Sequence, residues 1–298
     1  MEKTLTYEDL LTENDVLKRE VAFLKNQLSE SKVLLNQEQK VLMEHQKDLD
    51  DSISYAKRIQ QAIMAPISVV ERTLGDSFVL YIPKDVVSGD FYFVEKKNNY
   101  VFFSSVDCTG HGVPGALMSV VGFNYLHQAI MEKGIVQPDA ILSHLDEGVT
   151  DRLRQTGGES GVKDGMDLGL CALNLDTREL QFAGAYNPLY VVTKDGLTET
   201  KADKLPIGMN EDGVVDVYKN HTFQLEKGDC VYVFSDGYAD QFGGPHGKKF
   251  KYAQLREVLA GLFNVPMQDQ KKALIKAFED WKGDEAQIDD ICIIGVRV

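Results

Sequence analysis

The first 63 residues contain neither proline nor glycine, which predicts one long helix. Apolar residues recur there every seven positions, a pattern typical of a coiled coil. The main seam comprises Val21, Leu28, Leu35, Leu42, Leu49, Ala56 and Ile63. A second seam turns polar in its middle, at Ser31, Glu38, His45 and Ser52. A helix of this length spans about 90 Å, too long to pack back on one globule. We favour a parallel homodimer; an antiparallel pair and a partner helix are the alternatives, because heptads alone do not fix the orientation.

Pro66 ends this pattern, because proline cannot donate the next helical hydrogen bond. Residues 1–65 are therefore predicted to form a coiled-coil dimerisation and regulatory helix, and residues 66–298 a second domain. Strands are expected at 77–82, 91–94, 101–106, 168–175, 180–185, 189–193, 218–225 and 229–235, with a last strand at the end of the chain. Helices are expected at 114–133, 138–154, 252–262 and 267–281. This order predicts an α+β fold with antiparallel sheets.

Composition excludes several classes of protein. Lys and Arg total 32 against 46 Asp and Glu, a formal net charge of -14, so we expect no nucleic-acid partner. No apolar run approaches the ~20 residues of a membrane span, and the polar start does not read as a secretory signal. We therefore expect no membrane partner and a cytoplasmic location. The four cysteines lack zinc-site or redox spacing, which indicates buried thiols.

Acidic residues adjoin four apolar runs in the second domain. Asp90 precedes 91–94, Asp107 follows 100–106, Asp236 follows 231–235, and Asp289 with Asp290 precedes the terminal run. Each alone would be ordinary turn chemistry. A sheet can bring distant strand ends together, however, and carboxylate oxygens suit hard cations such as Mg²⁺ or Mn²⁺. Recurrence at strand ends therefore favours a metal site.

One of these segments has further unusual chemistry. Asp107 is followed by two glycines, Gly110 and Gly112, which let a backbone approach a ligand closely. Pro114 then opens a helix, whose N-terminus suits an anion. A carboxylate, a glycine loop and a helix start thus follow one another directly.

Five segments resemble the SpoIIE-type branch of the metal-dependent PPM serine/threonine phosphatases. They are PKDVVSGDFY (83–92), DCTGHGVPGA (107–116), DGMD (164–167), FSDGYADQ (234–241) and DD (289–290). The resemblance covers the chain from about residue 55 to its end. It implies an αββα sandwich of two antiparallel sheets flanked by helices, with two Mn²⁺ or Mg²⁺ ions in a cleft between the sheets. In that family a metal-bridging water attacks phosphorus directly.

The resemblance also implies roles for individual residues. Asp107 would bridge the two metals, and Asp90 would serve one of them directly or through water. Asp236 and Asp289 would hold the other. Asp290 competes with Asp289 for that role, because successive strand residues face opposite sides.

The resemblance has implications for four further positions. Cys108 would give a main-chain carbonyl to the metals, at a position where relatives usually carry glycine. His111 would either donate a proton to the leaving seryl or threonyl oxygen, or bond to the backbone and shape the glycine loop. No arginine stands where many relatives clamp the phosphate, Lys84 being a weak substitute. The run 185–188 lacks the aspartate of a third metal.

These implications define the expected function. The chain is expected to be a protein serine/threonine phosphatase acting on a phosphorylated protein, suspected to be a STAS-type anti-sigma-factor antagonist of a partner-switching pathway. The segment Ser52 to Ile63 would carry regulation from the coiled coil to the site. The alternative is a catalytically silent scaffold that binds phosphoprotein and signals through its coil. The native metal, the physiological substrate and the upstream signal are left open.

Overall fold

The computed structural model describes residues 6–153, 164–208 and 217–298. The chain divides into two compact units, Met1–Ser54 and Tyr55–Val298. The second unit starts upstream of Pro66 and takes in the last turns of the first helix. The boundary expected between residues 65 and 66 stays a prediction.

Helix α1 is one continuous element from Tyr7 to Ile63, as expected for the long helix. Its apolar seam is exposed: Leu28, Leu35 and Leu42 show 56%, 53% and 69% of their surface. A surface of this kind normally has a partner, because burying such side chains stabilises a helix far more than its intrinsic propensity does. Within the described ranges, no helix combines the length and the apolar character needed to cross a bilayer.

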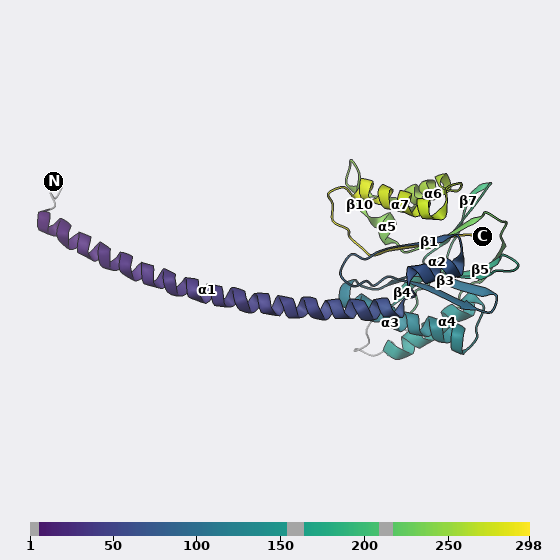
Figure 1. Ribbon diagram of the computed structural model, residues 1–298, viewed down its shortest axis with the longest axis horizontal. Coiled ribbons are helices and arrows are strands. Elements are labelled where there is room, and N and C mark those ends of the chain that lie inside the picture. Colours follow the sequence, from purple (N-terminus) through teal and green to yellow (C-terminus); the bar gives the residue numbers. More distant parts are fainter. Residues whose placement is uncertain (1–5, 154–163, 209–216) are drawn as a thin grey trace. The chain divides into compact units, whose positions relative to one another are not determined.

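The second unit contains two five-stranded antiparallel sheets (Figure 1). The first has the order β1-β12-β9-β6-β7 and the second β2-β3-β4-β5-β8. The strands of the first sheet are β1 (Ser77–Ile82), β6 (Leu189–Thr193), β7 (Gly196–Thr200), β9 (Cys230–Phe234) and β12 (Ile291–Arg297). Those of the second are β2 (Phe91–Lys97), β3 (Tyr100–Cys108), β4 (Met166–Asn174), β5 (Glu179–Ala185) and β8 (His221–Gln224). A short hairpin adds β10 (Phe242–Gly243) and β11 (Lys248–Lys249).

Helices cover the outer face of each sheet. Helices α3 (Gly112–His127) and α4 (Pro138–Leu153), joined by a π-helical turn η1 (Gln128–Glu132), pack on the second sheet. Helices α6 (Lys251–Gly261) and α7 (Met267–Lys282) pack on the first, and the two pairs lie on opposite sides in Figure 1. The predicted αββα sandwich is therefore confirmed. Two short helices, α2 (Ile67–Leu74) and α5 (Gly237–Asp240), complete the unit.

The alternation of side chains along β9 explains how one sheet serves two cores. Val231 and Val233 belong to the apolar cluster that joins the sheets, whereas Cys230, Tyr232 and Phe234 belong to the cluster under α6 and α7. Successive strand residues point to opposite faces, so a run of apolar residues is buried on both sides. All four cysteines are free and buried, as interpreted from the sequence.

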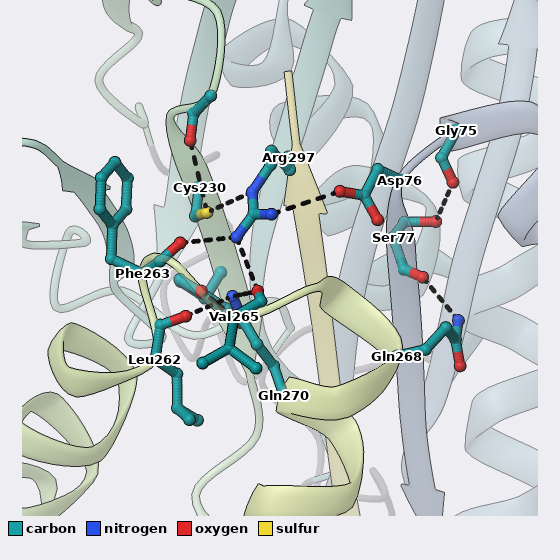
Figure 2. Close-up of polar contacts among 12 residues, drawn as sticks. Gly75, Asp76, Ser77, Cys230, Leu262, Phe263, Val265, Gln268, Gln270 and Arg297 are labelled. Carbon is teal, nitrogen blue, oxygen red and sulfur yellow. Dashed lines mark hydrogen bonds and ion pairs between the residues drawn. The ribbon is translucent and has the colours of Figure 1, made fainter.

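Arg297, near the end of β12, ties the first sheet to the α6–α7 loop (Figure 2). Its guanidinium donates to the carbonyl oxygens of Phe263 at 2.6 Å and Val265 at 2.8 Å. It also approaches Cys230 Sγ at 3.4 Å and pairs with Asp76 at 3.5 Å. The planar fork of arginine suits several acceptors at once. This side chain therefore fixes the loop against the sheet.

Several elements differ from the expectation. Helix α2 follows Pro66 where a direct passage into strands was expected, and the polar edge strand β7 was not expected. The strand expected at 218–225 is shorter, His221–Gln224, and α3 begins at Gly112, two residues before Pro114. These differences lie at edges and termini, where packing decides more than local sequence does.

Candidate metal centre

Strand pairing gathers the acidic residues at one end of the sandwich. In the β2–β3 pair Phe91 lies opposite Val106, which places Asp90 beside Asp107. In the β9–β12 pair Ile293 lies opposite Phe234, which places Asp236 beside the Asp289–Asp290 step. Contacts of β3 with β9 and β12 then bring the two sets together. The strand register therefore brings these strand ends together, as expected from the sequence.

Asp90 is buried, with 2% of its surface exposed. Its Oδ2 atom has no hydrogen-bond partner among the described residues. Burial raises its pKa well above the ordinary value; a hydrogen bond with Ser235 opposes this, and the charges of Asp290, Asp289 and Asp236 add to it. A buried oxygen without a partner is costly, so this atom is suited to an added cation or proton.

Asp107 and Asp236 lie close to each other and influence each other's pKa. Burial raises the pKa of Asp107 well above its ordinary value, and the charges of Asp90 and Asp236 raise it further. Burial and then the Asp289 charge raise the pKa of Asp236, against a hydrogen bond with the Asp107 side chain. Mutual repulsion of this kind disfavours the charged forms and is relieved by a bound cation.

Asp289 and Asp290 have different surroundings. Asp290 is buried, and its two oxygens accept hydrogen bonds from the backbone amides of Lys84 at 2.7 Å and Gly89 at 2.8 Å. Asp289 is partly exposed, and its Oδ1 accepts a hydrogen bond from the Asp290 amide at 2.8 Å. Asp290 therefore anchors the loop that leads to Asp90, whereas Oδ2 of Asp289 has no hydrogen-bond donor among the described residues.

The Cys108 carbonyl lies in a crowded stretch of backbone. A Cβ on Gly89 would come within 3.0 Å of this oxygen and 2.4 Å of the Gly110 carbonyl. A Cβ on Gly115 would come within 2.2 Å of the same Gly110 oxygen. Only glycine fits at these two contacts. Cys108 itself is absent from the non-glycine residues with positive φ, so its side chain causes no strain of that kind.

His111 precedes α3 and lies at the surface. Its Nδ1 is 2.7 Å from Asp85 Oδ2, and 55% of its side chain is exposed. A carboxylate at one ring nitrogen fixes the tautomer and leaves Nε2 available for proton transfer. Both expected roles, proton donor and shaping of the loop, are compatible with this contact.

An open cavity of about 300 Å³, here the carboxylate cavity, adjoins this cluster. Asp107, Asp236 and Asp167 line it together with Thr109 and Tyr186. Asp167 lies opposite Asp107 in the β3–β4 pair, and burial followed by the Asp236 charge raises the pKa of Asp167 to about 6. The cavity thus presents carboxylates at its wall.

The donor chemistry fits divalent cations, because the cluster offers carboxylate oxygens, among them the unpartnered Asp90 Oδ2. In the part of the chain that the structure describes, no three His, Cys, Asp or Glu side chains form a ready-made ligand set. Like-charged carboxylates repel one another, so bringing them to ligand distances requires the cation itself. The metal assignments of Asp90, Asp107, Cys108, Asp236 and Asp289 stay predictions.

Sequence reasoning missed three contributors to this region. Gln60, at the end of α1, is buried and hydrogen bonds to Ser88, two residues before Asp90. Asp85 holds His111, and Ser235 bonds to Asp90. Asp85 and Ser235 lie within two of the segments that carry the family resemblance, 83–92 and 234–241, and could have been predicted as site residues. Gln60 carried no signal, because glutamine is an ordinary helix-forming residue and another glutamine, Gln61, follows it.

Comparisons with known proteins agree with this architecture. The family model for Stage II sporulation protein E (SpoIIE) matches residues 97–298. Phosphoserine phosphatase RsbU of Bacillus subtilis is 29% identical over 207 residues, which cover 67% of this chain. The same alignment covers 57% of RsbU, so the chain spans less than two thirds of that relative's length.

Solved structures share the fold. The SiaA-PP2C domain of Pseudomonas aeruginosa superposes with a TM-score of 0.76 at 34% identity, covering 85% of this chain and 98% of that one. The PP2C phosphatase domain of the cell fate determinant SpoIIE from Bacillus subtilis, with a fragment of its regulatory domain, has a TM-score of 0.60 at 21% identity. That match covers 75% of this chain and 63% of the other.

Proposed function

The chain belongs to the SpoIIE family, and from this premise we propose that it is a metal-dependent protein phosphatase that hydrolyses phosphoserine or phosphothreonine in a protein substrate. The observation that carries the proposal is the cluster of three carboxylates with raised pKa values: Asp90 is buried, and Asp107 and Asp236 line the carboxylate cavity. Groups with such strongly shifted pKa values in a cavity are typical of catalytic sites. RsbU, the curated relative, is named a phosphoserine phosphatase.

Five residues are proposed to hold two Mn²⁺ or Mg²⁺ ions. Asp107 would bridge both, Asp90 would serve one, and Asp236 and Asp289 the other, with the Cys108 carbonyl as a further oxygen donor. When bound, the two ions would lower the pKa of a shared water and neutralise charge on the phosphoryl group. The Asp290 side chain would hold Lys84 and Gly89 in place, so that Asp90 meets its ion in a fixed position.

His111 is proposed as the proton donor to the leaving seryl or threonyl oxygen. Asp85 would hold its Nδ1, so that Nε2 presents the proton. An exposed position suits this role, because a protein substrate must reach the ring from outside.

The substrate is proposed to be a cytoplasmic phosphoprotein, a STAS-type anti-sigma-factor antagonist of a partner-switching pathway. This rests on family analogy, since related folds can host different substrates. The exposed seam of α1 supports a homodimer formed through the coiled coil. The Gln60–Ser88 contact supports regulation through that helix, because it connects the end of α1 to the loop before Asp90.

The test is release of phosphate from a phosphoserine protein by the full chain with Mn²⁺. Asp107→Asn and Asp236→Asn are the site variants, and Asp195→Asn, which removes an exposed carboxylate outside the carboxylate cavity, is the matched control. We expect activity in the wild type and the control and its loss in both site variants. A wild type that binds the phosphoprotein but never turns it over would indicate a catalytically silent scaffold. Deletion of residues 1–50 tests the coil: unchanged metal affinity and turnover would reduce it to an oligomerisation element.

A further inference from the structure

A second cavity of about 300 Å³ lies next to the carboxylate cavity. Its lining includes the aromatic side chains of Tyr186, Tyr190 and Tyr252 and the cationic side chains of Lys201, Lys204 and Arg256. We call it the tyrosine cavity. None of these six residues belongs to the proposed metal site.

Tyr186 lines both cavities and so marks where they meet. It has a φ of 58°, an unusual backbone conformation for a residue with a side chain, and remains 49% exposed. Its amide donates to the Asp203 carbonyl at 2.9 Å, which holds this conformation. A strained, exposed aromatic residue between two cavities is typical of a ligand-contacting position.

Tyr252 lines the tyrosine cavity. Burial raises its pKa, and the charges of Asp236, Asp240, Tyr190 and Asp107 add to the effect. Its hydroxyl is therefore within electrostatic reach of two carboxylates of the metal site. A peptide whose phosphate is held at the proposed metal site can reach the tyrosine cavity past Tyr186, which lines both cavities.

The lysines of this cavity stand on a fixed segment. Asp203 donates its amide to the Gly184 carbonyl at 3.0 Å, and Ile207 exchanges two 3.0 Å hydrogen bonds with Met166 of β4. A Cβ on Gly184 would come within 2.7 Å of the Ala202 side chain, so the segment lies close against β5. Lys201 and Lys204 are therefore presented from a backbone that is already ordered, which reduces the entropy cost of binding.

The charge of this cavity contrasts with that of the chain. The protein carries a formal net charge of -14, yet three cationic side chains line this one cavity. Arg256 pairs at 2.9 Å with Glu199, the acidic residue in the lining of this cavity. Lys201 and Lys204 are exposed and make no ion pair within the described residues. These two lysines, beside the three tyrosines of the cavity, favour a ligand that carries carboxylates.

We propose that the tyrosine cavity is a docking subsite for acidic residues that flank the phosphoserine or phosphothreonine of the protein substrate. Tyr186 contacts the chain between the phosphorylated residue and the acidic residues, and Lys201 and Lys204 pair with the carboxylates. The subsite thus selects acidic sequence contexts. This inference rests on the proposed phosphatase function and adds a specificity to it.

The test compares two phosphoserine peptides on the full chain with Mn²⁺. One carries glutamates on both sides of the phosphoserine, and its partner carries glutamines at the same positions. The readout is the ratio of kcat/KM for the two peptides. The variant is Lys201→Glu/Lys204→Glu, and the control is Lys96→Glu/Lys227→Glu, which changes the net charge equally at exposed lysines outside both cavities. Lys201→Ala/Lys204→Ala removes the charges without reversing them.

We expect the wild type and the control to favour the acidic peptide by about tenfold, the gain from two partly exposed ion pairs. In Lys201→Glu/Lys204→Glu the ratio should fall to one or below, and in the alanine variant to near one. Higher salt should reduce the wild-type ratio, because exposed ion pairs are screened. A wild-type ratio near one, or a preference that survives in both variants, would overturn the docking subsite while leaving the phosphatase intact. A wild type that hydrolyses neither peptide nor the phosphoprotein would overturn the proposed function itself.

Discussion

The side-chain amide of Gln60 donates to the Ser88 carbonyl at 2.6 Å, and the Ser88 amide donates back to Gln60 Oε1 at 3.2 Å. The Gln60 amide also donates to Ser119 Oγ at 2.9 Å. One buried side chain thus joins the last turns of α1 to the loop before Asp90 and to helix α3. We therefore expect a movement of α1 at this point to be transmitted to the loop before Asp90.

Gln60→Ala should lower the free energy of unfolding by about 2 kcal/mol, because it leaves buried polar groups of Ser88 without partners. It should also raise the Mn²⁺ concentration for half-maximal activity, since the loop holding Asp90 loses an anchor. Chemical denaturation and a Mn²⁺ titration of turnover measure the two effects. Gln46→Ala, at an exposed position of the same helix, is the control. An unchanged Mn²⁺ requirement in a destabilised Gln60→Ala would show that this contact is only structural.

The variants Asp289→Asn and Asp290→Asn should distinguish the proposed metal ligand, Asp289, from the residue that anchors the loop, Asp290. Asparagine at 290 would turn a donor toward the amide of Lys84 or Gly89, which we expect to cost about 1–3 kcal/mol of stability. At 289 the amide oxygen can still accept from the Asp290 amide, so stability should hold while phosphate release falls by more than about 100-fold. Thermal unfolding and phosphate release check both. A stable Asp290→Asn beside an unstable Asp289→Asn would reverse the two roles.

The metal-free protein should become less stable as the pH rises from about 4 toward neutrality. Carboxyl groups with raised pKa values bind more protons in the folded state than in the unfolded chain over this window, so folding is favoured at its acidic end. For Asp167 the window runs from 3.8 to about 6. Thermal unfolding in EDTA across this pH range measures the slope, and a rising stability would contradict the prediction.

Asp236→Asn should stabilise the metal-free protein at pH 7 because it removes one of the repelling charges. We expect the melting temperature to rise by roughly 2–4 °C. The same variant should lose the stabilisation that Mn²⁺ gives the wild type. Scanning calorimetry with and without Mn²⁺ measures both quantities. A lower melting temperature in EDTA would indicate that Asp236 holds the fold together by a contact other than those described.

Arg297→Lys should lower stability by about 2 kcal/mol, although the charge is kept. An ammonium cannot reach the Phe263 and Val265 carbonyls and Asp76 together (Figure 2). Urea unfolding gives the difference. Arg72→Lys, at an exposed position on α2, should change stability by less than about 0.5 kcal/mol.

Leu28→Lys/Leu35→Lys should convert a dimer to a monomer, because it places charges in the exposed seam of α1. Asn26→Lys/Asn36→Lys adds the same charge at positions outside the seam and should leave the dimer intact. Sedimentation equilibrium of the full chain distinguishes the two states. A wild type that is monomeric at all concentrations would contradict the coiled-coil homodimer.

The sandwich could be predicted from the sequence where one periodicity dominates. Strand β9 is apolar at every position and α1 has an uninterrupted seven-residue repeat, so each has one plausible structure. Helix α2 was missed because Pro66 was read only as the end of a helix, although Ile67, Val70 and Leu74 have helical spacing. Strand β7 is polar and its only support is its pairing with β6, which local sequence does not reveal.

The site was predictable to the extent that strand ends are visible in the sequence. The convergence of Asp90, Asp107 and Asp236 follows from register, and each stands next to an apolar run. The different surroundings of Asp289 and Asp290 depend on a loop about 200 residues earlier in the chain, an interaction without a sequence signal. The tyrosine cavity depends on the segment after β7 lying against β5, which again follows only from the folded chain.

Strand β12 lies between β1 and β9, so a segment far downstream of β1 in the sequence occupies an inner position of the first sheet. Until residues 291–297 have left the ribosome, β1 lacks its neighbour in that sheet, and Asp289 cannot reach the other carboxylates. A nascent chain that has released β1 but not β12 therefore carries an open, apolar sheet edge, which favours aggregation. The same arrangement delays assembly of the proposed metal site, so that a cation can meet its full set of carboxylates only after β12 has been synthesised.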